Sequence, residues 1–227
     1  MKVIIGCEES QRVCTAFREK GHEAYSCDIL ECSGGHPEWH IQQDVLPLLN
    51  GDCDFLTMDG KPHSISGKWD MIIAHPPCTY LTASSAIRLF NRDHTIKDKG
   101  REAQGWEAAS FFYSFLNADC PRIAIENPAP LKHFNLPDYT QIIEPYMFGD
   151  PWKKRTCLWL KGLPPLRPTN IVEPKGLWVG STSGRHGATG RVKSSYVLNS
   201  NRDPKIRSKT FPGIAQAMAE QWGGECK

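Results

Sequence analysis

The chain has 227 residues, of which 40% are hydrophobic and 23% charged, and this is the usage of an ordinary globular protein. That length allows one well-buried core with a small appended lobe, but not two full domains. No run of 18 apolar residues occurs, which argues against a transmembrane helix. The opening MKVIIGCEES also lacks the apolar stretch of a secretory signal, so we expect a cytoplasmic protein.

A net charge of only +2 conceals two segments of opposite sign. Residues 1–150 carry 13 Lys and Arg against 21 Asp and Glu, whereas residues 151–209 carry 13 against 2. A segment this basic favours a polyanionic partner.

The nine cysteines show no CxxC pairing. Structural zinc sites use closely spaced ligands, and a disulfide framework belongs to a secreted protein. We therefore expect reduced cysteines, most of them acting as small core hydrophobes, and no metal site.

In chain order, apolar patterning alternates between strand-like and helix-like segments. The first part gives a strand at 3–5 ending at Gly6, a helix from Ser10 to Gly21, a strand at 23–27 ending at Asp28, a weak strand at 40–42 and a hairpin at 54–66. The second part gives a strand at 69–74, a loop with or without a short helix at 79–100, a helix at 102–116, strands at 122–125, 142–148 and 156–160, and a helix at 211–222. Residues 162–209 are rich in Pro, Gly, Ser and Arg, which is typical of a loop-rich insert.

Strands that alternate with helices predict an α/β fold with a parallel sheet. Ligands bind such sheets at the carboxyl ends of the strands. The predicted strand ends carry the polar and special residues of the chain: Gly6, Asp28, Asp44, His75 to Cys78, and Glu126 with Asn127. This pattern predicts an active site at that edge.

Cys78 is the sharpest of these signals. It follows two prolines at a strand end, so a stiff backbone fixes the direction of a nucleophilic thiol. Glu126 ends the next buried strand, where burial is expected to raise its pKa and suit it to donating a proton. A structural cysteine and a surface glutamate are the plainer alternatives. His75 is either a base, a cation beside Cys78, or an ordinary strand-end histidine.

The first strand and its turn resemble a cofactor site. A carboxylate at Asp28 suits ribose hydroxyls, and Asp44 is placed to reach an adenine amino group. The turn Gly6-Cys7-Glu8-Glu9 lacks the GxGxxG spacing, and its two acids would repel a pyrophosphate. A cofactor with a sulfonium charge and no phosphates therefore fits better than a dinucleotide, although each acid could equally be a turn or helix-cap residue.

Together, Pro76-Pro77-Cys78 and Ile125-Glu126-Asn127-Pro128 resemble the Pro-Cys and Glu-Asn-Val motifs of the DNA cytosine-5 methyltransferases. The segment 149–155 is similar to that family's Gln-x-Arg-x-Arg segment, and 213–219 to its closing helical motif. The resemblance also extends to small methylase-like proteins of phages and prophages, and it covers most of the chain outside about 165–205.

The resemblance implies a Rossmann-like methyltransferase sheet, with residues 1–161 and 206–227 forming the catalytic domain and 162–205 a short basic recognition insert. It implies that Cys78 attacks C6 of a flipped cytosine, that Glu126 contacts N3 and that Arg155 holds the base or supports the Cys78 loop. S-adenosylmethionine, the implied methyl donor, would lie against Gly6, Cys7, Glu8, Asp28, Ile29, Asp44 and Pro76. Double-stranded DNA, the implied partner of a monomeric bacterial or phage-encoded enzyme, would contact Arg88, Arg92, Lys154, Arg185, Arg191 and Lys193.

Two other readings stay open at this point. One is a related enzyme that modifies C5 of a pyrimidine with another substrate or another transferred group, because the cofactor turn departs from the family pattern. The other is a catalytically silent DNA-binding or defence-blocking protein on the same fold.

Overall fold

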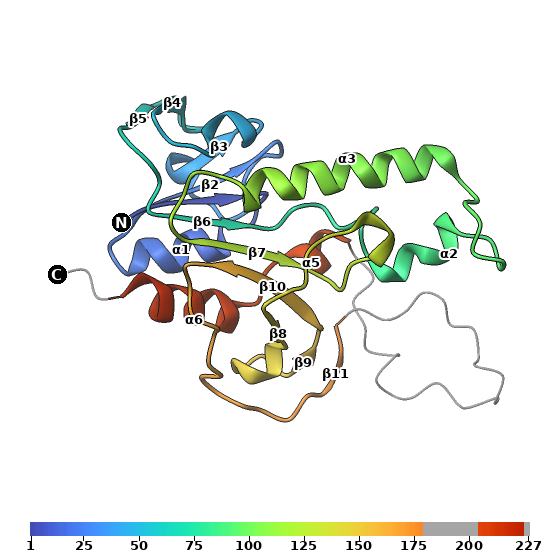
Figure 1. Ribbon diagram of the computed structural model, residues 1–227. Coiled ribbons are helices and arrows are strands. Elements are labelled where there is room, and N and C mark those ends of the chain that lie inside the picture. Colours follow the sequence, from blue (N-terminus) through green and yellow to red (C-terminus); the bar gives the residue numbers. More distant parts are fainter. Residues whose placement is uncertain (179–203, 225–227) are drawn as a thin grey trace.

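The computed structural model describes residues 1–178 and 204–224, and its centre is a seven-stranded sheet (Figure 1). The strands lie in the order β3-β2-β1-β6-β7-β10-β8. Their bounds are β1 Lys2–Gly6, β2 Glu23–Asp28, β3 His40–Gln42, β6 Met71–Ala74, β7 Ile123–Asn127, β8 Gln141–Ile143 and β10 Thr156–Lys161. Counted within this sheet alone, the first five strands follow the order 3-2-1-4-5 of doubly wound sheets. The expected α/β class with a mostly parallel sheet is confirmed.

The central strands are apolar along their whole length because both faces of the sheet are covered. In β1, Ile4 packs on one side with the aromatic side chains of α3 (Lys99–Leu116). Its neighbour Ile5 packs on the other side with α1 (Arg12–Glu19) and α6 (Pro212–Gly223). Figure 1 shows α3 on one side of the sheet and α1 with α6 on the other.

The sequence pattern predicted a parallel sheet, but the observed sheet is not wholly parallel. Strand β10 pairs antiparallel with both β7 and β8. The predicted strand at 142–148 is also wrong, since β8 ends at Ile143 and a 3-10 turn follows at Pro145–Met147. Proline has no N–H to donate to a strand ladder. No helical crossover separates β8 from β10, and without one the chain returns in the opposite direction.

The remaining elements lie around this sheet. The predicted hairpin is confirmed as β4 (Cys53–Leu56) and β5 (Pro62–Ile65), paired antiparallel. The expected loop at 79–100 holds a short helix α2 (Ala86–Leu89), and α3 begins earlier than predicted because the Asp98 carboxylate accepts the Arg101 N–H at 2.9 Å. Other short elements are β9 Trp152–Lys153, β11 Gly176–Leu177, α5 Pro204–Ser208 and 3-10 turns at Pro37–Trp39, Leu46–Leu48, Ala83–Ser85 and Lys132–Phe134.

Part of the predicted recognition insert lies outside the described residues, including Arg185, Arg191 and Lys193. Its described beginning returns to the body of the protein, because β11 pairs with β9 just before the sheet strand β10. Of the helices in the described ranges, none is long and apolar enough to cross a membrane.

Candidate active site

The sheet order reverses between β1 and β6, so the loops after these strands diverge to opposite sides and leave a crevice-forming edge. Cys78 follows β6, and Glu126 lies near the end of the adjacent strand β7. The two strands pair in parallel, with Ala74 opposite Ile125. The fold therefore brings the predicted nucleophile and the predicted acid to one edge.

The loop from His75 to Cys78 is held at three points. The His75 N–H donates to the Gly6 carbonyl at 2.9 Å, which joins the loop to β1. The Asn127 amide donates to the Pro76 carbonyl at 2.8 Å, which joins it to β7. The Cys78 carbonyl accepts N–H bonds from Leu81 and Thr82, which begin the next turn. A backbone fixed in this way presents the thiol in one direction.

Three side chains converge on the Glu126 carboxylate. His75 Nδ1 lies 3.0 Å from Oε2, and Thr210 Oγ1 donates to the same oxygen at 3.4 Å. Lys154 Nζ lies 3.8 Å from the other oxygen, Oε1. The carboxylate is only 10% exposed, so these contacts replace most of its hydration.

The pKa of Glu126 is lowered to about 2, contrary to the value predicted from burial. Burial does raise it, but the Lys154 ammonium and the hydrogen bond and charge of His75 together lower it further. The sequence pattern predicted that Glu126 is buried, but it did not predict its contacts with Lys154 and His75. Glu126 is thus ionised in the free protein.

The Cys78 thiol is affected both by burial and by nearby cations. Burial raises the pKa of its thiol, and the charges of Lys154 and Arg207 lower it only in part. The His75 ring is engaged with Glu126 through Nδ1. A neutral thiol beside a lysine is the resting state of this site.

The structure exchanges the places expected for two neighbouring cations. Lys154, predicted to contact DNA, lies against Glu126 and acts on Cys78. Arg155, predicted to be catalytic, is exposed, and none of the described contacts joins it to either residue. Both residues lie in the short connection between β9 and β10, where the Lys154 side chain turns inward and the Arg155 side chain is exposed.

In the turn after β1, which belongs to the predicted cofactor site, the Glu8 side chain occupies the start of α1. Glu8 is 3% exposed, and its carboxylate accepts the N–H groups of Val13 at 2.7 Å and Cys14 at 3.1 Å. These are free donors at the start of α1, the position that binds a pyrophosphate in dinucleotide enzymes. Glu8 therefore already fills the anion site. Its pKa is raised to about 7, chiefly by burial.

The other predicted cofactor residues surround Cys7, which stands just beyond β1 with a φ of 59°. Burial raises the pKa of the Cys7 thiol, and the charges of Asp28 and Asp44 raise it further, so both acids lie near this turn. Each also holds its own turn, because Asp28 accepts the Leu30 N–H and Asp44 the Leu46 N–H, both at 3.0 Å.

Ile29 beside them is 73% exposed, whereas Pro76 is buried in the loop before Cys78. Gly6 has no room for a side chain, since a Cβ there would lie 2.8 Å from Phe115 Cε1. An exposed apolar surface beside two carboxylates, with the helix end already occupied, fits a cationic, phosphate-free adenosine ligand better than a dinucleotide.

The remaining predicted contacts lie on the surface. Arg88 in α2 and Arg92 after it are both exposed, in the segment between β6 and α3. Across the described ranges, no three His, Cys, Asp or Glu side chains are grouped to hold a metal ion. The eight cysteines in those ranges are free thiols.

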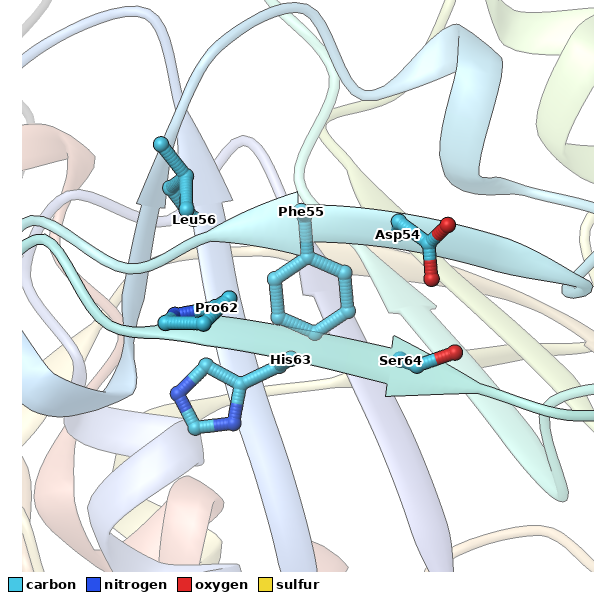
Figure 2. A pocket seen from close by; sticks show the side chains of 6 residues that line it. All are labelled: Asp54, Phe55, Leu56, Pro62, His63 and Ser64. Atoms are coloured by element: carbon cyan, nitrogen blue, oxygen red, sulfur yellow. The ribbon is translucent and has the colours of Figure 1, made fainter.

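A shallow hollow lies elsewhere, on the hairpin β4–β5. Figure 2 shows its lining of Asp54, Phe55, Leu56, Pro62, His63 and Ser64. It contains none of the predicted site residues, and its hairpin lies beyond the β3 edge of the sheet (Figure 1).

No model of a known protein family matches the chain, and no curated protein matches it either.

Proposed function

We propose that the protein is an S-adenosylmethionine-dependent DNA cytosine-5 methyltransferase. The observation that carries the proposal is the cluster of Cys78, Glu126 and Lys154 at the ends of β6 and β7. A thiol on a fixed loop, next to an anchored carboxylate and an ammonium group, is the set of groups that nucleophilic addition to a pyrimidine needs.

The chemistry begins at the thiol. Cys78 loses its proton to solvent water and adds to C6 of a cytosine that has left the duplex. The sulfur electron pair forms the S–C6 bond, the C5–C6 π pair moves to C4–C5, and the C4–N3 π pair takes a proton at N3. In this proposal Lys154 stabilises the thiolate and contacts the ring oxygen, and Glu126 contacts N3 and the amino group. C5 becomes nucleophilic as a result.

The residues around Cys7 would hold the cofactor. Asp28 and Asp44 offer carboxylates to ribose and adenine donors, and the exposed Ile29 offers an apolar surface to the adenine ring. When bound, S-adenosylmethionine supplies an electrophilic methyl group to C5. Water then takes the C5 proton, the C5–H electron pair restores the C5–C6 double bond, and the S–C6 pair leaves on sulfur as the Cys78 thiolate.

The DNA contacts of the proposal are the exposed arginines beside the Cys78 loop and the basic segment after residue 151. Arg88 and Arg92 are placed to reach phosphates on one side of a flipped base. Phosphate contacts supply affinity but carry little sequence information. Binding is therefore expected to weaken steeply as salt concentration rises.

The test is methyl transfer to DNA by the wild-type protein and by Cys78→Ala, followed by mass spectrometry of the nucleosides. The proposal expects a product heavier than cytosine by one CH₂, absent with Cys78→Ala, while DNA and cofactor binding persist. Full activity in Cys78→Ala rejects it. A different mass gain identifies another transferred group, and tight DNA binding without a covalent adduct on 5-fluorocytosine DNA identifies a silent binding protein.

A further inference from the structure

His75 is a buried histidine with one ring nitrogen engaged and the other free of partners. Its Nδ1 lies 3.0 Å from Glu126 Oε2, while Nε2 is enclosed and has no hydrogen-bond partner among the described residues. The side chain is 12% exposed. A polar atom enclosed without a partner costs free energy, so its retention here calls for a role.

The charged groups around His75 come from three elements. Glu126 on β7 and Glu8 in the turn after β1 both act to raise the pKa of the imidazole, whereas Lys154 before β10 lowers it. Burial alone would lower the pKa, but the bond and charge of Glu126 with the charge of Glu8 outweigh it, and the net direction is upward. The contact with Glu126 and the nearby Glu8 carboxylate thus favour the protonated ring.

The addition chemistry proposed above needs a proton at N3. Glu126 brings none of its own, because its two cationic partners keep it ionised. Lys154 lies 3.8 Å from Oε1, and its charge lowers the pKa of the Cys78 thiol. Of the groups that contact Glu126, the imidazolium of His75 is the remaining acid, at hydrogen-bond distance from Oε2.

We infer that His75 is a positioning residue that fixes Glu126 and holds the proton that Glu126 passes to the base. This inference rests on the proposed function. The Nδ1–H bond breaks and its electron pair stays on the imidazole, the proton moves to the carboxylate, and the carboxyl group protonates N3 as sulfur adds to C6. Thiolate, base and imidazolium become thioether, N3–H and neutral imidazole. Before the methylated base leaves, the N3 proton returns through the Glu126 carboxylate to His75.

The first test is the pH dependence of methyl transfer in His75→Asn. The asparagine amide can replace Nδ1–H as a hydrogen-bond donor but carries no transferable proton, so a purely positional role survives the change. We expect the rate constant at neutral pH to fall about 100-fold, with the DNA dissociation constant unchanged. The wild-type decline at alkaline pH, caused by deprotonation of His75, is expected to vanish.

A matched control is His133→Gln. His133 Nε2 makes the same kind of pair with Glu102 Oε1 at 2.8 Å, outside the site, and glutamine imitates Nε2. This variant is expected to keep the wild-type rate and pH profile. If the wild type is active and His75→Asn shows the same rate and pH profile, the inference is overturned but the proposed function stands. A wild type without any methyl transfer overturns the proposed function, and the inference with it.

A second measurement does not depend on activity or on the stability of the asparagine variant. Nitrogen-15 NMR of labelled histidine follows the titration of His75 in the wild type and in Glu126→Gln. The inference expects a pKa above the ordinary range in the wild type and a lower one in Glu126→Gln. Identical titration of His75 in both proteins overturns it.

Discussion

The Asn127 side-chain amide donates to the Pro76 backbone carbonyl across 2.8 Å, and this bond joins the end of β7 to the loop that presents Cys78. Both residues are buried, so no solvent competes for the bond. Asn127 therefore ties the loop that presents Cys78 to the strand that carries Glu126.

Asn127→Ala tests this link. The change leaves the Pro76 carbonyl buried and unpaired, which costs about 1–3 kcal/mol of unfolding free energy. We also expect the methyl-transfer rate to fall, because the Cys78 loop is no longer fixed. Urea denaturation measures the first effect. Asn91→Ala removes an exposed amide that bonds only to Thr95 and serves as the control, expected to stay within about 0.5 kcal/mol of the wild type.

Two neighbouring substitutions separate the inward cation from the outward one. Lys154→Met removes the ammonium beside Glu126, so the pKa of Glu126 is expected to rise and methyl transfer to fall about 100-fold. Arg155→Met removes an exposed charge and is expected to leave that pKa unchanged. Carbon-13 NMR of labelled glutamate measures the pKa. Equal effects of the two substitutions would contradict the arrangement.

Glu8 makes stability depend on pH. Its pKa rises on folding from 4.5 to about 7, so the folded state binds more protons than the unfolded state between these values. Stability from this group is present at low pH and is lost as pH rises from about 4.5 to about 7, by roughly 3 kcal/mol. Glu8→Gln is expected to remove this decline. Unfolding curves of both proteins across the same pH range measure it, and parallel curves would refute the assignment.

Two glycine substitutions are expected to have opposite signs. In Gly6→Ala the new Cβ would lie 2.8 Å from Phe115 Cε1, which costs about 1–3 kcal/mol through overpacking at the end of β1. In Gly100→Ala the new Cβ meets only Asp98 Oδ1, at 3.4 Å, within the first turn of α3. Alanine favours a helix by about 0.5–1 kcal/mol over glycine. Thermal denaturation distinguishes the two.

The sequence predicted where the site lies because the strand ends carry polar residues immediately after apolar runs. Such local patterning places Cys78 and Glu126 at one edge without any knowledge of pairing. It could not give the direction of β10, which depends on the missing crossover after β8. It also could not give the ionisation of Glu126, because Thr210 and Lys154 reach it from segments distant in the chain.

The sequence also could not show that Lys154, and not Arg155, lies against Glu126. A motif match weighs residue types, and it selected the arginine. The direction of each side chain depends on the backbone between β9 and β10, which residue types alone do not give. Likewise, Glu8 read as a repelling acid in an open turn, whereas the fold uses it to bind the first donors of α1.

The position of α6 has a consequence for the order in which the protein matures during synthesis. This helix packs on α1, and the segment before it supplies Thr210 to Glu126 and Lys209 to Ser33, 2.7 Å away. During synthesis, Cys78, Glu126 and Lys154 are therefore added to the chain well before α6 exists to cover its part of the sheet face that carries Ile5. A ribosome-bound chain that stops before residue 204 therefore lacks both the packing of α6 on α1 and the Thr210 contact to Glu126.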